Sequence, residues 1–585
     1  MNNVSLKEQI THYLRLVYDS DMLQKQHYQT HQEFADDLIT AMGLTPTKQE
    51  NSPPPHKNHW DETRSVLITY ADSLLEEDVK PLHTLHDFID RYCQDNISDI
   101  HILPFYPYSS DDGFSVINYM SVNESHGEWS DIHALAQLKN LMFDLVINHC
   151  SSRSQWFQEF INAQGQGQHM FYTASPEGDY SAVTRPRTSP LLRSTSTVEG
   201  EKHVWCTFSH DQVDFDFSHP MVLLEFAKII AFYLNNGAKL FRLDAVAFLW
   251  KELGTSCINH PNTHTIIKIY RLLIEHACHD AVVITETNIP NHENLQYFGN
   301  ANEAHAIYNF ALPPLLLHTL MSGDSSAITR WQMAMPPAQN GTTYFNFIAS
   351  HDGIGLRPVE NLLSSAQKDA LITSCQSQDA RINWRTLPDG SQSAYEINIA
   401  LFSACGTTHA GTDDWQIARF ICAHTIMFGL EGIPGLYIHS LIGTPNDLAR
   451  AENSGQNRCI NRHQWDFSKL TTELSNPSSP HHLVYTQIDK LLRLRSKQRA
   501  FHPNATQFTL QLGKHIFGFW RQSIDRQQSI FCISNITNQK QSVNVQDINL
   551  VNTQKWYDLL SAETLDEDKV NIQLMPYQTV WITNT

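Results

Sequence analysis

The 585-residue chain is poor in charged residues and has no surplus of positive charge. Asp, Glu, Lys and Arg make up 17% of it, whereas about 25% is usual, and a disordered, solvated chain is thereby excluded. Acidic residues outnumber basic ones by 61 to 41, which gives a formal net charge of −20. Nucleic acids and anionic membranes bind through an excess of Lys and Arg, so we expect neither as a partner.

The chain also lacks paired cysteines, long apolar runs and metal-binding motifs. Its ten cysteines include no C-x-x-C pair, and we interpret them as buried, reduced thiols. No run approaches the roughly 18 apolar residues of a membrane span, and the N-terminus has no signal-peptide core. Among 31 histidines there is no H-E-x-x-H or close His–carboxylate pattern. We therefore predict a cytoplasmic protein with no metal and no cofactor.

Eight short β-branched runs alternate with helical patterns from Val66 onward. Strands that alternate with helices build parallel sheets, so the sequence predicts an α/β fold with a (β/α)8 TIM barrel. The helical pattern is clearest in 221–237, which ends on a glycine. The expected strands are 66–70, 99–105, 141–149, 238–246, 281–288, 306–310, 343–352 and 432–438.

The segments outside this repeat predict the domain organisation. We expect an N-terminal helical extension closed by the Pro-rich segment NSPPPHKN, two inserted subdomains after strands three and seven, and a C-terminal antiparallel β-domain. The expected bounds are 1–57 for the extension, 58–149, 216–352 and 421–505 for the barrel, 150–215 and 353–420 for the insertions, and 506–585 for the β-domain.

Ionisable side chains collect at the carboxyl ends of four predicted strands, which in a barrel face one pocket. A single such residue could be a helix cap or a surface group, but agreement among four strands indicates a shared site. The residues are Asp144, Asn148 and His149 on the third strand, Arg242 and Asp244 on the fourth, Glu286 on the fifth, and His351 and Asp352 on the seventh.

This set of residues suits the transfer of a glycosyl group. Cleaving an acetal needs one carboxylate that attacks the anomeric carbon and one carboxylic acid that protonates the leaving oxygen. We expect Arg242 to keep Asp244 ionised for attack, and burial after the apolar run AVVIT to raise the pKa of Glu286. Asp352 is suited to accept hydrogen bonds from sugar hydroxyls. In addition, Arg185 and Arg187 flank a proline and could clamp an anion, or form a solvated loop end.

The segments DLVINH, FRLDAV, TET and ASHD resemble the four signature segments of the α-amylase superfamily. The segments LPFYPYSSDDGF, TRPR, VWCTF, GTSC, FALPPLLLH, SHDGIG and NRCINRH resemble the sucrose-phosphorylase subgroup, over roughly 58–585. Within it, HWDE, LITYADS, SAVTRPR, TETN and AYEIN are most similar to glucosylglycerate phosphorylases. The resemblance implies a retaining phosphorylase, a monomer or homodimer, that acts on small molecules, namely an α-glucoside and phosphate.

The resemblance also implies roles for thirteen residues. It makes Asp244 the nucleophile, Glu286 the acid/base and Asp352 the transition-state stabiliser. The matching residues around the glucosyl ring are Asp111, Phe114, His149, Arg242, His351 and Arg458, and those on the phosphate and acceptor side are Arg187, Phe208, Asn288 and Tyr395.

Three departures from sucrose phosphorylases bear on the acceptor. Asn288 replaces a histidine, and Ser393 and Glu396 replace an aspartate and a glutamine. Loss of the aspartate favours an anionic acceptor such as glycerate, whereas Glu396 opposes it unless it points away or binds a hydroxyl. Sucrose, sucrose 6′-phosphate and glucosylglycerol remain alternative donors. Hydrolysis of an α-glucoside by the same fold remains an alternative reaction. A non-catalytic binding protein is disfavoured by the complete carboxylate set.

Overall fold

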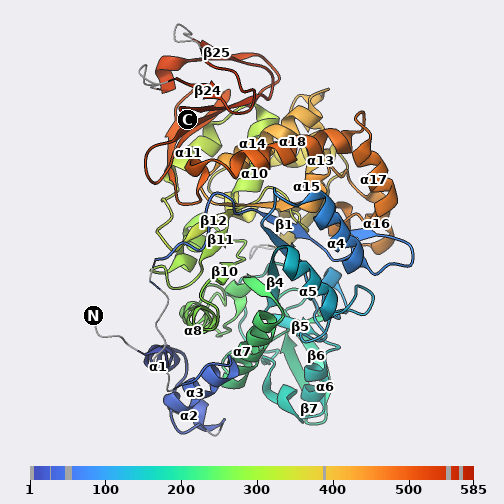
Figure 1. The fold of residues 1–585 in the computed structure, drawn as a ribbon. Coiled ribbons are helices and arrows are strands. Elements are labelled where there is room, and N and C mark those ends of the chain that lie inside the picture. The colour runs from blue at the N-terminus through green and yellow to red at the C-terminus, as the bar shows by residue number, and fades with distance from the viewer. Residues whose placement is uncertain are drawn as a thin grey trace.

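Eight parallel strands close into a barrel at the centre of the molecule (Figure 1). The computed structural model describes residues 5–26, 28–46, 54, 56–386, 391–548, 555–565 and 571–585. The predicted (β/α)8 barrel is confirmed, and each expected strand contributes to it. Around the barrel the strands are β1 (Val66–Thr69), β3 (Asp99–Ile102), β4 (Asn140–Val146), β9 (Ala238–Asp244), β10 (Val282–Thr285), β11 (Ala306–Tyr308), β12 (Thr343–Asn346) and β18 (Ile433–Tyr437), which pairs with β1.

Most of these strands end earlier than the sequence indicated. The expectation that strand seven reaches Asp352 is wrong, because β12 ends at Asn346. Its last register partner in β18 is Pro434, and β18 continues to Tyr437 in pairing with β1 alone. The chain therefore leaves the barrel rim before the residues with chemical function. Glu286 likewise follows the last residue of β10, so of the carboxylates Asp244, Glu286 and Asp352 only Asp244 is still within its strand.

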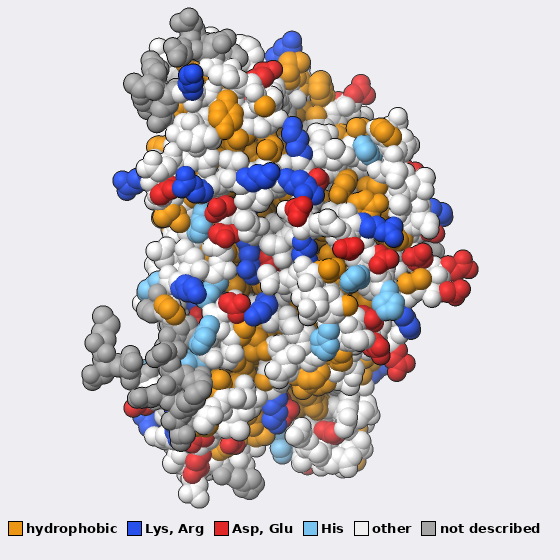
Figure 2. All heavy atoms as spheres, in the orientation of Figure 1, with side chains coloured by type: hydrophobic (Ala, Val, Ile, Leu, Met, Phe, Trp, Pro, Cys, Tyr) orange, Lys and Arg blue, Asp and Glu red, His pale blue; other side chains and the backbone are white. Residues whose placement is uncertain are grey.

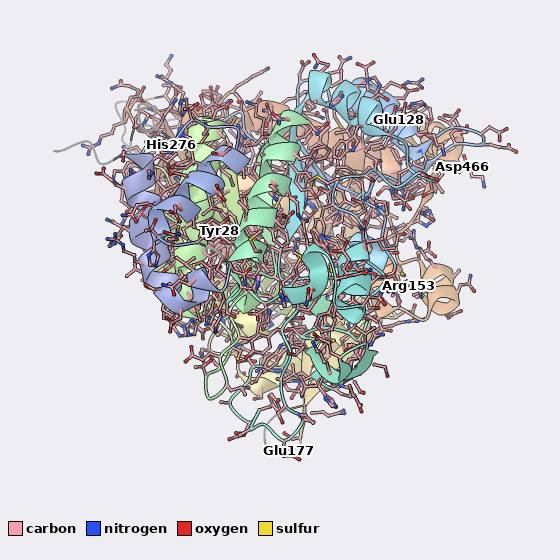
Figure 3. The ribbon with its side chains drawn as sticks, turned by 90° about the horizontal axis from the view of Figure 1, so that it is seen from below. Tyr28, Glu128, Arg153, Glu177, His276 and Asp466 are labelled. Atoms are coloured by element: carbon pink, nitrogen blue, oxygen red, sulfur yellow. The ribbon has the colours of Figure 1, made fainter. Side chains whose placement is uncertain are left out.

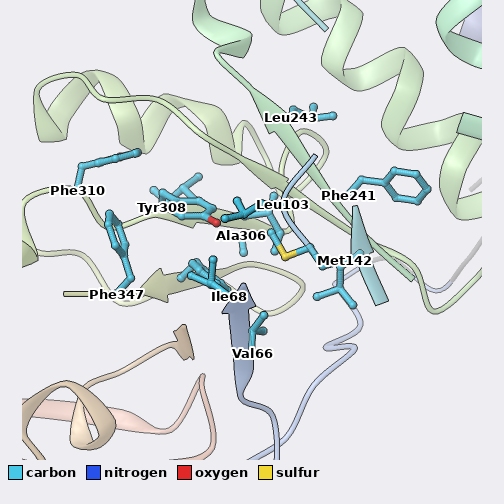
Figure 4. Packing of buried hydrophobic residues seen from close by; sticks show 14 of the residues in the cluster. Val66, Ile68, Leu103, Met142, Phe241, Leu243, Ala306, Tyr308, Phe310 and Phe347 are labelled. Atoms are coloured by element: carbon cyan, nitrogen blue, oxygen red, sulfur yellow. The ribbon is translucent and has the colours of Figure 1, made fainter. Parts of the chain in front are cut away.

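Side chains alternate between the inside of the barrel and the surrounding helices. Figure 4 shows Ile68, Met142, Ala306 and Tyr308 gathered at the centre, while Phe241 and Leu243 point away from it. In β9, Arg242 lies between those two outward side chains and Asp244 follows them, so both must face inward. The alternation therefore places Arg242 and Asp244 inside the barrel, at the carboxyl ends of its strands and above an apolar core.

Helices surround the barrel, and several begin with proline at the first turn, where a missing N–H costs nothing. The outer helices include α4 (Pro81–Tyr92), α5 (Trp129–Leu138), α7 (Pro220–Asn235), α8 (Pro261–Ala277), α10 (Leu312–Ser322), α14 (Gln416–Gly429) and α18 (Pro480–Arg495). Helix α7 ends before Gly237, whose φ of +99° few other residues adopt. None of the described helices combines the length and the apolar character needed to cross a membrane.

Two insertions rise from the carboxyl ends of the strands. The first contains β5 (His149–Ser151), α6 (Gln155–Ile161), β6 (Leu192–Thr197), β7 (Gly200–Trp205) and β8 (Gln212–Asp214). The second contains β13 (Ile354–Gly355), α12 (Ser365–Gln376), β14 (Arg381–Thr386) and β15 (Gln392–Asn398). In Figure 3 the loop that carries Glu177 reaches the edge of the molecule. Strand β5 spans the expected boundary at 149/150 and α14 begins before 421, so the exact domain bounds stay a proposal.

The two ends of the chain pack on different parts of the barrel (Figure 1). At the N-terminal end, α1 (Leu6–Val17) contacts α8, and α3 (His31–Ala41) contacts α7. At the C-terminal end, an antiparallel sheet packs on α14. Its strands follow the order β20 (Thr506–Leu510), β21 (Ile516–Gln522), β22 (Ser529–Asn535), β26 (Thr579–Thr583) and β24 (Tyr557–Asp558). The Pro-rich break expected at 51–58 lies largely outside the described residues.

The charged side chains on the visible surface agree with the acidic composition of the chain. Figure 2 shows acidic side chains gathered at the right-hand edge of the visible face, and Lys and Arg elsewhere on it interspersed with acids. All ten cysteines are free thiols, and nine of them are buried.

The packing of α1 can be tested with a pair of leucines on opposite faces of that helix. Leu14 is 0% exposed and Leu16 is 57% exposed. We expect Leu14→Ala to destabilise the docked helix by about 2–5 kcal/mol, because a buried side chain leaves a cavity. Leu16→Ala should change the stability by less than about 0.5 kcal/mol. Thermal unfolding and proteolysis of the N-terminal segment would measure both, and equal sensitivity of the two variants would contradict this packing.

Candidate active site

A pocket of about 780 Å³, its open mouth included, lies at the carboxyl ends of the barrel strands. Both insertions contribute to its walls. Every one of the thirteen residues selected from the sequence lines it. These are Asp111, Phe114, His149, Arg187, Phe208, Arg242, Asp244, Glu286, Asn288, His351, Asp352, Tyr395 and Arg458.

The floor of the pocket is built around the buried guanidinium of Arg242. Its Nη1 donates to Asp244 Oδ1 at 2.6 Å and also to Asp144, while its Nη2 lies 3.9 Å from Glu286 Oε2. Asp144 is anchored from the other side by His101, whose Nε2 is 2.6 Å from Oδ2. One cation thus joins carboxylates from three neighbouring strands.

Asp244 and Glu286 are side by side because their strands are in register. Leu243 of β9 pairs with Thr285 of β10, so the next residue on each strand projects in the same direction. The backbone N–H of Ala245 donates to Glu286 Oε2 at 2.9 Å. Ala245 has a left-handed φ of +49°, and this turn directs its N–H toward the glutamate.

Burial dominates the protonation of this pair. It raises the pKa of Asp244 well above the usual value, and Arg242 opposes the rise without cancelling it. Arg242 does act on Asp244 in the expected direction, but burial outweighs it, so the ionisation of Asp244 by Arg242 stays a prediction. Burial also raises the pKa of Glu286, assisted by the charge of Asp352. Since Arg242 is closer to Asp244, we expect Asp244 to be the ionised member when the pair holds one proton.

The opposite wall carries a second carboxylate–arginine set. Arg458 Nη1 lies 2.6 Å from Asp352 Oδ1, and its Nη2 donates to Glu396 Oε1 at 2.9 Å. Burial alone would raise the pKa of Asp352, but Arg458 and Arg242 hold it below the usual value. Asp352 is therefore an anion inside the pocket. His351 beside it stacks on Phe114, with 4.8 Å between ring centroids.

Glu396 is fully committed to protein partners. It accepts from Arg458, from the backbone N–H of Gly353 at 3.1 Å and from Asn383 Nδ2 at 2.8 Å. Arg458 and Arg187 keep its pKa low although burial opposes this. Its two oxygens are thereby occupied by donors from the protein. Ser393 does not line the pocket, so the loss of an aspartate at that position acts only at a distance.

His149 is held by a polar network beneath the pocket wall. Its Nε2 lies 3.0 Å from the Phe114 carbonyl and its Nδ1 lies 3.2 Å from Asn148 Nδ2. Lys251 in turn donates to Asn148 Oδ1 at 2.9 Å and pairs with Asp214 at 3.0 Å. The network fixes the imidazole ring against the pocket.

Arg187 and Arg185 diverge on either side of the proline between them. The Arg187 guanidinium lies 5.3 Å from the Tyr395 ring centroid and 5.8 Å from that of Phe208. Arg185 instead donates to the carbonyl of Ser189 and lines an adjoining pocket. The two arginines therefore meet only in the adjoining pocket, and whether they clamp an anion stays a prediction. Only Arg187 faces the catalytic pocket.

Several lining residues were not selected from the sequence, namely Gln212, Phe248, Phe310 and Arg357. Arg357 carried one usable signal, because it precedes a proline in a loop of the active face, as Arg185 does. The aromatic residues carried none, since apolar side chains at such positions serve the core equally well.

A separate group of His59, Glu275 and His305 brings its ligand atoms within 4.8 Å of one another, and His305 precedes β11 at the amino end of that strand. Arg271 Nε lies 2.6 Å from Glu275 Oε1, so a cation already balances this carboxylate. We assign no metal there.

Comparison with known proteins agrees with this geometry. The Alpha-amylase family (alpha amylase, catalytic domain) matches residues 91–356. The chain is 39% identical to a glucosylglycerate phosphorylase of Escherichia coli, over 99% of this chain and 100% of that protein. It is 28% identical to a sucrose phosphorylase of Streptococcus mutans, over 75% and 88%. The crystal structure of a sucrose 6F-phosphate phosphorylase from Thermoanaerobacter thermosaccharolyticum superimposes with a TM-score of 0.71 at 24% identity, covering 88% and 98%, and supports the fold.

Barrel, pocket and relatives together define an enzyme of the glycoside-cleaving barrel class. The chain belongs to the α-amylase superfamily and, within it, to the phosphorylase subgroup that contains these relatives.

Because the pKa of Glu286 is raised, we expect this residue to make the stability of the folded protein depend on pH. Above its usual pKa of 4.5, the carboxyl ionises in the unfolded chain while burial keeps it protonated in the folded protein, so its destabilising effect grows as pH rises toward the raised pKa. Glu286→Gln removes that cost, and we expect its melting temperature to exceed that of wild type by an amount that increases from pH 4.5 to pH 8. Glu177→Gln, on the exposed loop labelled in Figure 3, should show no such trend. A difference that shrinks with rising pH would contradict the assignment.

Proposed function

We propose that the protein is a retaining α-glucoside phosphorylase. In this reaction 2-O-α-D-glucosyl-D-glycerate and phosphate give α-D-glucose 1-phosphate and D-glycerate. The observation that carries the proposal is the meeting, in one pocket, of the Asp244–Glu286 pair, the anionic Asp352 and the inward-facing Arg187.

The first displacement breaks the glycosidic bond. Glu286 donates its proton to the bridging oxygen while an Asp244 oxygen attacks the anomeric carbon, so glycerate leaves and a β-glucosyl ester forms. Neighbouring strands lie about 4.8 Å apart, close to the roughly 5–5.5 Å separation of retaining enzymes. Asp352, held ionised by Arg458, stabilises the positive charge that develops on the sugar.

The second displacement returns the glucosyl group to phosphate. Glu286, now ionised, takes a proton from phosphate, whose oxygen attacks the anomeric carbon as the ester bond to Asp244 breaks. Retention of the α configuration follows from two inversions. Arg187 favours phosphate over water, because a guanidinium binds an oxyanion through paired hydrogen bonds. Its only protein hydrogen bond among the described residues, to the Pro186 carbonyl, is long at 3.3 Å.

Glycerate is favoured as the acceptor by two observations. The glucosylglycerate phosphorylase compared above shares more of its sequence with this chain than the sucrose phosphorylase does. Glu396, the acid that replaces a glutamine in the acceptor loop, is paired with Arg458. Sucrose, sucrose 6′-phosphate and glucosylglycerol are the alternative donors, and hydrolysis is the alternative reaction. We further propose the cytoplasm as the location, in keeping with ten unpaired thiols.

Product analysis with and without phosphate tests the phosphorylase assignment. Wild type should form glucose 1-phosphate only when phosphate is present. Asp244→Asn should lose at least about 10⁴-fold in turnover, because the ester cannot form. Arg187→Ala should weaken phosphate binding by about 10- to 100-fold and release more free glucose. Free glucose as the main wild-type product in both conditions would establish the hydrolase instead.

A competition among acceptors tests the glycerate assignment. With glucose 1-phosphate as donor, we expect D-glycerate to be used on the order of 10²-fold or more better than fructose or fructose 6-phosphate. A site built to pair with one acceptor leaves buried polar atoms unpaired when a poor match binds. The ratio of kcat/KM values measures this preference. If fructose or its phosphate is the better acceptor, the glycerate assignment fails while the phosphorylase assignment stands.

A further inference from the structure

A second pocket adjoins the mouth of the active site and is rich in arginine. Arg185, Arg187, Arg357 and Arg385 line it together with Thr188 and residues 180–184, and no acidic residue of the described chain is part of its lining. Arg187 and Arg357 line the catalytic pocket as well. In a chain with a net charge of −20, a local surplus of cations next to a catalytic pocket is what an anionic substrate requires.

Three of these four arginines are already engaged by the protein. Arg385 pairs with Glu360, Arg185 donates to the Ser189 carbonyl, and Arg187 stacks on Tyr395 and Phe208. The Arg357 guanidinium has neither a hydrogen bond nor an ion pair with any residue that the structure describes. The nearest acid in sequence, Glu360, is taken by Arg385. Arg357 is thus a half-buried cation available to a ligand.

Arg357 is also mounted on a rigid support. It begins the turn Arg357–Val359, whose Pro358 and Val359 are buried. The preceding residue, Leu356, donates its N–H to the Tyr395 carbonyl at 3.0 Å, which ties the turn to β15. A guanidinium held this way can select by shape as well as by charge.

Asn288 completes a polar pair on the same side. It contacts the strand that leads to Arg357, since a Cβ added at Gly355 would lie 2.7 Å from Asn288 Nδ2. Its Oδ1 is buried and has no hydrogen-bond partner in the described part of the chain. A buried acceptor without a donor is costly, so a ligand hydroxyl would satisfy it.

The chemistry of the two anions separates Arg357 from Arg187. In phosphate, the free oxygens are two bonds from the oxygen that attacks the sugar. In a 2-hydroxy acid, the carboxylate oxygens are three bonds from it, and so reach further from the anomeric carbon. Both arginines line the catalytic pocket, but Arg187 already packs on the rings of Phe208 and Tyr395, whereas Arg357 has no such contact among the described residues. With Arg187 assigned to phosphate, Arg357 is the cation left for the carboxylate.

We propose that Arg357 binds the carboxylate of the acceptor acid and that Asn288 accepts a hydrogen bond from the hydroxyl on its carbon 3. The proposal rests on the proposed function and assigns its acceptor specificity to two residues.

Kinetics with glucose 1-phosphate as donor test Arg357. Arg357→Ala should raise the KM for D-glycerate on the order of 10- to 100-fold, while turnover with neutral glycerol, and the KM for phosphate measured in the phosphorolytic direction, stay unchanged. Arg357→Lys should recover part of the glycerate affinity, because lysine keeps the positive charge but lacks the paired N–H donors of a guanidinium. Arg381→Ala removes one charge from the same insertion outside both pockets, where Arg381 pairs with Glu452, and should leave every value unchanged.

The assignment of Asn288 is tested with D-lactate, which lacks the hydroxyl on carbon 3. Asn288→Ala should lower the preference for D-glycerate over D-lactate toward one, whereas Arg357→Ala should weaken both acids equally. A preference that persists in Asn288→Ala would overturn this half of the proposal.

The outcomes separate the two levels of inference. Equal losses with glycerate and glycerol, or a raised KM for phosphate in Arg357→Ala, overturn the role of Arg357 and leave the phosphorylase intact. A wild-type enzyme that forms no glucose 1-phosphate, or that does not use glycerate, overturns the proposed function and this proposal together.

Discussion

The guanidinium of Arg242 lies where three strands meet, and the carboxylates of Asp144, Asp244 and Glu286 are arranged around it. It is also enclosed by the rings of Phe114 and Tyr308, each centred 5.5 Å away. A buried cation of this kind is tolerated only when its charge is balanced and its donors are used. The strand register, the inward alternation and the apolar barrel core all serve to hold these groups together.

Sharing one guanidinium leaves these carboxylates incompletely compensated, and the proposed reaction depends on this. Three carboxylates compete for one guanidinium, so neither Asp244 nor Glu286 is fully compensated and burial raises the pKa of both. A pair that retains one proton can supply an attacking carboxylate and a carboxylic acid at the same time. Asp352 stays ionised because Arg458, assisted by Arg242, lowers its pKa by more than burial raises it. The distribution of two arginines among the carboxylates therefore sets which carboxyl group is acid and which is base.

Charge is distributed differently outside the floor of the active-site pocket. The protein as a whole is acidic, yet its adjoining pocket is lined by arginines. Short-range contacts decide binding in such a place, because solvent and ions screen distant charges while close pairs are screened less. An acidic protein can thus accept anionic substrates, provided that local cations such as Arg187 and Arg357 are not neutralised by the protein itself.

By itself, the sequence determined the barrel and the main carboxyl groups. Period-two alternation and strand ends placed Asp244 and Glu286, because a strand has only two faces and the barrel has one active end. The tertiary structure alone decided the charge state and availability of each group. Glu396 pairs with Arg458, 62 residues away, whereas Arg185 turns to a carbonyl and Arg357 is left without a partner in the described chain. Ionisation and hydrogen bonding depend on neighbours in space, which residues distant in sequence supply, so no local pattern could have revealed them.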